Sequence, residues 1–129
     1  MYPSNTNNPQ TIELDFERLR LLSWEHFIEP VKPFNWDAAC HQYRCFWGLK
    51  QRYPSLLLVP PTAALQLWQQ HILDTRTYRS DCQRLLARFL DHLPALGLYG
   101  EADQQQLHAA RSACDELLLK HYGAEALQA

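Results

Sequence analysis

The sequence is poor in glycine, and this scarcity excludes the common phosphate-binding loops. Only 4 of the 129 residues are Gly, and neither GxGxxG nor GxxxxGK occurs. Such loops need glycine because the backbone must approach the phosphate closely. The sequence therefore argues against nucleotide or dinucleotide binding.

Long apolar runs and runs of basic charge are also missing. The longest aliphatic run, Leu56 to Val59, is far shorter than the roughly 18 residues of a membrane helix. The opening MYPSNTNNPQ lacks the charged and apolar segments of a signal peptide. The formal net charge is −2, which removes the electrostatic basis for nucleic-acid binding. We expect a cytoplasmic protein that binds neither membranes nor nucleic acid.

Cysteine is present without a disulfide or zinc-knuckle pattern. The four cysteines, Cys40, Cys45, Cys82 and Cys114, are scattered and form no CxxC pair. In a chain without an export signal we expect reduced thiols, most of them ordinary core residues.

What the sequence does contain is typical of a globular helical domain. Hydrophobic residues make up 47% and charged residues 20%, and 129 residues suit one domain with a real core. Apolar residues recur at helical spacing, and the connections between the helical segments are short. We predict an all-α, compact single-domain bundle of about five helices over residues 11–123. Residues 1–10 would be a flexible N-terminal lead-in, and residues 124–129 a C-terminal tail.

Caps and breakers predict where the helices begin and end. Pro30 and Pro33 would stop the first helix, and Asn35 would cap the second. The prolines around residues 53–61 predict an extended segment or a turn, followed by a third helix over 62–73. A fourth helix would start near Asp74, carry Phe89 on its apolar stripe and end before Pro94. A loop over 93–100 would lead to a last helix capped by Asp103 and closed by Gly123.

Residues 68–92 carry a family resemblance. Within and just beyond this stretch, nine residues follow the order of a known motif: Trp68, His71, Leu73, Asp74, Thr75, Tyr78, Cys82, His92 and Pro94. The pattern resembles that of the glycine-rich domain-containing protein-like family, which runs Trp-His-x-His, a short break, a Tyr, often a Cys, then His before Pro. The segment from Tyr43 to Pro54 looks like a second motif of that family. The resemblance covers about residues 40–123 and implies a helical domain.

The chain departs from the family pattern at polar positions. Gln69 stands where the family has the first His of Trp-His-x-His, and Leu65 where an Asp is usual. Asp91 replaces the first His of a pair, and Ala87 a Gly. If those polar positions serve a metal or catalytic site in relatives, this chain has lost part of it.

One hypothesis is a metal site, with zinc the candidate ion. His71, Cys82 and His92 have the right donor types. Along one straight helix, however, Cys82 would lie roughly 16 Å and His92 roughly 31 Å from His71. The site therefore requires the chain to reverse at Asp74-Thr75 and to bend again near Ala87, where Ala makes a bend less favourable than Gly would.

Other interpretations treat the same residues as structural. His71 and His92 would then be hydrogen-bonded core or capping residues, and Trp68, Asp74, Tyr78 and Tyr43 packing anchors. The closest partners predicted for His71 are Asp74, Tyr78 or a histidine of another helix: His26, His41 or His108. Cys82 beside a His could be a nucleophile, although no sequence context supports an activated thiolate.

Two functions follow from these interpretations. The protein is either a small metal-binding domain or a non-catalytic protein–protein interaction module whose family site has become a packing centre. Catalysis is the minority expectation, and the sequence names no partner.

Overall fold

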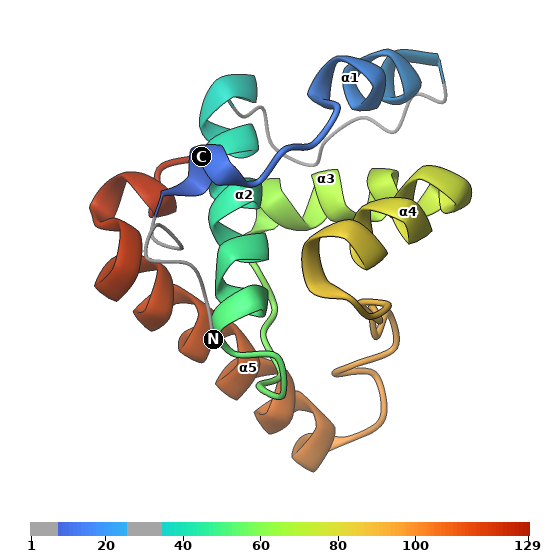
Figure 1. The fold of residues 1–129 in the computed structure, drawn as a ribbon. Coiled ribbons are helices and arrows are strands. Elements are labelled where there is room, and N and C mark those ends of the chain that lie inside the picture. Colours follow the sequence, from blue (N-terminus) through green and yellow to red (C-terminus); the bar gives the residue numbers. More distant parts are fainter. Residues whose placement is uncertain (1–7, 26–34) are drawn as a thin grey trace.

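The computed structural model describes residues 8–25 and 35–129, which form five α-helices and no strand. Figure 1 shows α2 crossing the middle of the bundle, with α5 on one side and α3 and α4 on the other. The bounds are α1 Phe16–Glu25, α2 Trp36–Arg52, α3 Thr62–Leu73, α4 Thr75–Leu86 and α5 Glu101–Tyr122, with 3-10 turns η1 Pro9–Thr11 and η2 Ala124–Leu127. The predicted all-α bundle is confirmed. The predicted stop at Pro30 and Pro33 and most of the lead-in lie outside the described residues.

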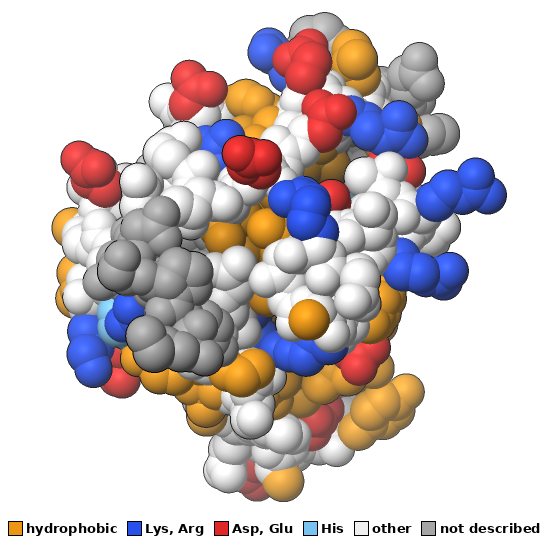
Figure 2. Space-filling view, viewed as in Figure 1, with side chains coloured by type: hydrophobic (Ala, Val, Ile, Leu, Met, Phe, Trp, Pro, Cys, Tyr) orange, Lys and Arg blue, Asp and Glu red, His pale blue; other side chains and the backbone are white. Residues whose placement is uncertain are grey.

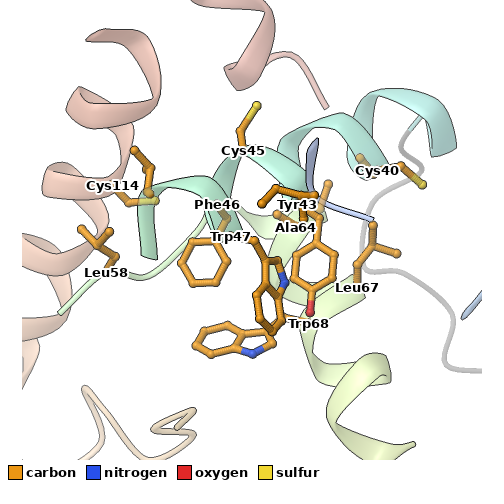
Figure 3. Close-up of a cluster of buried hydrophobic side chains, with 14 of the residues drawn as sticks. Cys40, Tyr43, Cys45, Phe46, Trp47, Leu58, Ala64, Leu67, Trp68 and Cys114 are labelled. Carbon is orange, nitrogen blue, oxygen red and sulfur yellow. The ribbon is translucent and has the colours of Figure 1, made fainter. Parts of the chain in front are cut away.

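Helix α2 is the centre of the core. It begins as predicted, because the Asn35 side chain accepts a hydrogen bond from the backbone N–H of Ala38 at 3.0 Å. It packs against α3, α4, α5 and both 3-10 turns. Tyr43, Phe46 and Trp47 have no exposed surface, and Figure 3 shows them facing Trp68 and Leu67. A helix this deeply covered fixes the positions of its neighbours.

A buried glutamine ties three elements together. The Gln42 side chain accepts from the backbone N–H of Ala64 at 3.2 Å and donates to the carbonyl of Ala126 at 2.8 Å. Ala126 is fully buried. Residues 124–129, expected as a tail, therefore include a turn that is part of the core.

The link between α2 and α3 is extended, as the prolines predicted. Its end is held to α5 by a hydrogen bond from the Val59 N–H to the Ala110 carbonyl at 3.3 Å. Because of this contact, residues 57–59 lie beside α5 although they are distant from it in sequence.

Helix α4 ends earlier than predicted. It stops at Leu86, because Ala87 adopts a left-handed conformation with φ 56°. Phe89, expected on the buried stripe, is 50% exposed, so that prediction is wrong. The expectation that Ala87 would disfavour a bend is also wrong: burial of Leu90 beyond it, at 4% exposure, stabilises a conformation that alanine rarely adopts.

Helix α5 begins before its predicted cap. Gly100 is the N-cap residue and Glu101 starts the helix. The Asp103 carboxylate instead accepts hydrogen bonds from the backbone N–H groups of Gly97 at 2.7 Å and Tyr99 at 3.1 Å, which folds the preceding loop onto the helix. The predicted end at Gly123 is confirmed, with φ 81°.

Replacing Ala87 by glycine is expected to stabilise the protein. Glycine adopts the left-handed conformation without the steric cost of a Cβ, so Ala87→Gly should raise the free energy of unfolding by about 0.5–1 kcal/mol. The matched control is Ala109→Gly on the exposed face of α5, which should lower it by about 1 kcal/mol. Urea denaturation measures both, and destabilisation by Ala87→Gly would contradict the assigned bend.

Candidate functional site

The His71 ring lies inside a chain of hydrogen bonds that joins three helices. Its Nδ1 is 2.7 Å from the Tyr43 hydroxyl, and its Nε2 is 2.7 Å from a carboxylate oxygen of Asp81. In the neutral imidazole, the Tyr43 hydroxyl donates to Nδ1 and the Nε2–H donates to Asp81. Since the side chain is 6% exposed and both nitrogens are engaged, His71 is held as a structural link between α2, α3 and α4.

Asp81 extends this series of hydrogen bonds toward the protein surface. Its other oxygen accepts from Arg84 at 2.9 Å. Burial raises the pKa of the Asp81 carboxyl, but the hydrogen bonds from His71 and Arg84 outweigh burial and leave that pKa below its usual value. Asp81 therefore stays ionised near neutral pH and keeps the His71 ring oriented.

Helix α1 closes over this region through an ion pair. Arg18 makes a bidentate contact with Asp74, with distances of 2.6 and 3.1 Å to the two carboxylate oxygens. The Arg18 hydrogen bond holds the pKa of Asp74 below its usual value. The cavity left beside His71 has a volume of about 10 Å³, which is space for about one water molecule.

Trp68 and Tyr78 hold the chain that follows α4. The Trp68 indole N–H donates to the Tyr78 hydroxyl at 2.9 Å, and that hydroxyl donates to the Leu90 carbonyl. The Tyr78 ring also packs edge-on against His71, with centroids 4.9 Å apart. Two of the predicted anchors, Trp68 and Tyr78, are therefore in contact, whereas the Asp74 carboxylate pairs with Arg18. His71 forms its hydrogen bonds with Tyr43 and Asp81 rather than with Asp74 or Tyr78.

The three predicted metal ligands lie in different surroundings. His71 is engaged as described, and Cys82 is buried beside Tyr78 with its thiol pKa raised by burial. His92 packs on the Trp68 ring at a centroid distance of 4.6 Å. Within residues 8–25 and 35–129, no group of three or more His, Cys, Asp or Glu could hold a metal ion.

A larger cavity lies on the other side of Trp68, and we call it the Trp68 pocket. Its volume is about 140 Å³. Its walls come from α2, α3, α5, residues 57–59 and residues 90–96: Lys50, Leu57, Leu58, Val59, Leu65, Trp68, Gln69, Leu90, Asp91, His92, Leu93, Pro94, Leu96, Leu107 and Arg111. Ten of these fifteen residues are apolar, and the other five, Lys50, Gln69, Asp91, His92 and Arg111, are polar or charged.

Three of the four positions at which the sequence departs from the pattern it resembles lie in the Trp68 pocket. Leu65, Gln69 and Asp91 all line it, together with the retained Trp68 and His92. The Nε2 atom of His92 is buried and has no hydrogen-bond partner among the described residues, and burial lowers the pKa of this side chain. These three positions therefore line this pocket rather than the cavity beside His71.

Sequence reasoning missed the residues that distant segments bring to the pocket. Lys50 of α2 is 6% exposed, and its ammonium donates to the Leu56 carbonyl at 2.5 Å. Leu107 and Arg111 come from α5. Their only sequence signal is that Leu107 and Arg111 are four residues apart and so share one face of a helix.

Four exposed apolar side chains lie on the loop after α4, and one of them, Leu93, lines the pocket. Phe89 and Leu93 are each 50% exposed, Leu98 71% and Tyr99 80%. We call these four residues the apolar loop. Figure 2 shows hydrophobic side chains gathered on the lower right of this face, where Figure 1 places the connection between α4 and α5.

Comparisons with protein-family models, curated proteins and solved structures find no match to this chain. The family resemblance stays a prediction. Among the described helices, none has the length and apolar character to cross a membrane.

Removing the His71 ring should destabilise the fold. His71→Ala leaves Tyr43 and the Asp81 carboxylate without a buried partner and opens a cavity, so the free energy of unfolding should fall by about 3 kcal/mol. Tyr43→Phe, which removes one donor, should cost about 1–2 kcal/mol. The exposed His108→Ala is the control and should change stability by less than about 0.5 kcal/mol. Equal effects of His71→Ala and His108→Ala in urea denaturation would contradict the structural role of His71.

Metal content tests the zinc hypothesis against this geometry. Because both His71 nitrogens are engaged and Cys82 is a buried thiol, we expect protein purified without tag or chelator to carry far less than one ion per chain. Elemental mass spectrometry measures this directly. One zinc per chain in the wild type, lost in His71→Ala but kept in His108→Ala, would establish a metal site.

Proposed function

We propose that this protein is a non-catalytic protein–protein interaction module that binds its partner through the apolar loop and the Trp68 pocket. The observation that carries the proposal is four large, exposed apolar side chains on the loop between α4 and α5, one of which, Leu93, lines a partly open pocket. Exposed apolar side chains that are contiguous favour contact with another molecule, whereas scattered ones are ordinary.

The pocket has the size of an anchor site. Its volume of about 140 Å³ is below the roughly 300 Å³ at which small-molecule pockets usually begin, and it suits one side chain of a partner. Interfaces commonly gain most of their affinity from one or two side chains inserted into such pockets. The apolar loop would surround the inserted group and exclude water.

The loop is held in place for this role. Leu90 is anchored by the Tyr78 hydroxyl, and Asp103 binds the backbone at Gly97 and Tyr99. Exposed residues on a fixed loop lose little conformational entropy on binding. The loop is therefore suited to recognition.

The alternatives have less support in the geometry. Residues with the chemistry for a reaction, His71 and Cys82, are buried and separated from the pocket opening by hydrogen-bonded packing. This favours a binding role over catalysis. It also favours binding over the metal hypothesis, for which elemental mass spectrometry is the test.

Site-specific photo-crosslinking in cells that express the protein tests the proposal. A photoreactive amino acid at position 98, in the apolar loop, should give a defined crosslinked species. The same group at position 73, which replaces an equally prominent leucine with 66% exposure at the end of α3, should not. Introducing Tyr99→Ser and Leu93→Ser beside the probe should remove the species at position 98. Identical products from positions 98 and 73, or none from position 98, would contradict an interaction surface at the loop.

A further inference from the structure

The Trp68 pocket contains a buried positive charge for which the described residues provide no counter-ion. Lys50 is 6% exposed, and its one hydrogen bond goes to a neutral acceptor, the Leu56 carbonyl. Among residues 8–25 and 35–129, no carboxylate forms an ion pair with it. A buried ammonium is costly unless it is paired, so an anionic ligand that reached it would be strongly favoured.

Other charges near Lys50 increase the preference for an anion. Arg111 lines the same pocket, and the charge of Arg88 acts with burial to lower the pKa of Lys50. One acid, Asp91, also lines the pocket, and Asp115 lies near Arg111 on α5. Asp91 is exposed, whereas Lys50 is buried, so the charge least screened by water is positive.

Most of the other residues in the pocket wall are apolar, and Gln69 and His92 add two further polar side chains. Leucine side chains from three separate segments, Leu58, Leu65 and Leu107, line the cavity around Trp68. A ligand must therefore present an apolar group and an anionic group within one small volume. A phosphate ion has no apolar group. An Asp or Glu side chain has a carboxylate but no second, apolar branch that could fill the leucine-lined part of the pocket.

We propose that the Trp68 pocket binds the C-terminal carboxylate of a partner polypeptide that ends in an apolar residue. In a chain end, the carboxylate and the last side chain branch from one Cα, so both fit a cavity of about 140 Å³. The carboxylate pairs with the Lys50 ammonium, and the side chain fills the leucine-lined part beside Trp68. Carboxylate capture at a chain end is an established mode of peptide recognition. This inference rests on the proposed interaction function and names its partner's chemistry.

Peptide titration tests the inference with matched ligands. The probes are acetylated GSGS peptides ending in Leu, Ile, Val or Phe, each as a free acid and as a C-terminal amide. We expect at least one free acid to bind by calorimetry and its amide to bind about tenfold or more weakly. The same peptide ending in Lys should bind as weakly as the amide. No binding by any free acid at millimolar concentration, or equal binding of acid and amide, would overturn the inference.

Variants assign the effect to the pocket. Lys50→Met should abolish the difference between acid and amide, while Lys120→Met, an exposed lysine on α5, should leave it unchanged. Circular dichroism checks that Lys50→Met is folded, and Arg111→Gln, at an exposed position, provides a second variant that should weaken acid binding. Retention of the full acid preference in both variants would overturn the assignment.

Two further results separate the possible sources of the ligand. N-acetyl-leucine contains both groups that the pocket would recognise, so we expect it to bind about as tightly as the peptide. Tighter binding of isocaproate, which lacks the acylated amide, than of N-acetyl-leucine would overturn the polypeptide assignment in favour of a small apolar acid. If the crosslink from position 98 maps to an internal segment of the partner, and the free acids do not bind, the interaction module stands and the chain-end inference fails.

Discussion

The hydrogen-bonded link from Tyr43 through His71 to Asp81 determines how α2, α3 and α4 are arranged. Each of its two bonds is 2.7 Å long and the ring is almost fully buried, so each helix must present one polar group at a fixed point in the core. Buried polar groups cost free energy unless all are paired, so this link excludes other arrangements of the three helices. With α3 and α4 fixed, Trp68 and Tyr78 meet and hold Leu90.

The position of the loop follows from that contact and from the bend at Ala87. The bend ends α4 and turns the chain so that Leu90 enters the core while Phe89 remains outside. His92 then returns to the Trp68 ring, which brings it to the pocket instead of to His71. A strained backbone conformation persists only where the surrounding packing stabilises it, as the burial of Leu90 does here. The same turn creates the pocket and exposes the apolar side chains at its edge.

The helices were largely predictable from the sequence because local rules govern them. Asn35, the prolines before Thr62 and the break at Asp74 predicted helix ends that the structure contains. Ala87 and Asp103 were misjudged, since tertiary contacts at Leu90 and at the backbone of Gly97 override local preference there. The pocket could not be predicted. Lys50, Val59 and Arg111 meet only through the packing of α2 and α5, and no sequence spacing records that contact. The predicted metal ligands lie in different surroundings: His71 is hydrogen-bonded inside the core, and His92 lines the Trp68 pocket.

The central claim is that His71 is a structural residue, whereas His92 belongs to the binding pocket. Its most direct test is a nitrogen-15 NMR spectrum of the histidine rings, recorded with the apolar peptide acid and separately with zinc. We predict that the His92 signals shift on addition of the peptide, while His71 keeps a single tautomer, protonated at Nε2, under both conditions. A His71 signal that shifts with one equivalent of zinc, while His92 ignores the peptide, would contradict it and make the buried histidine the functional centre.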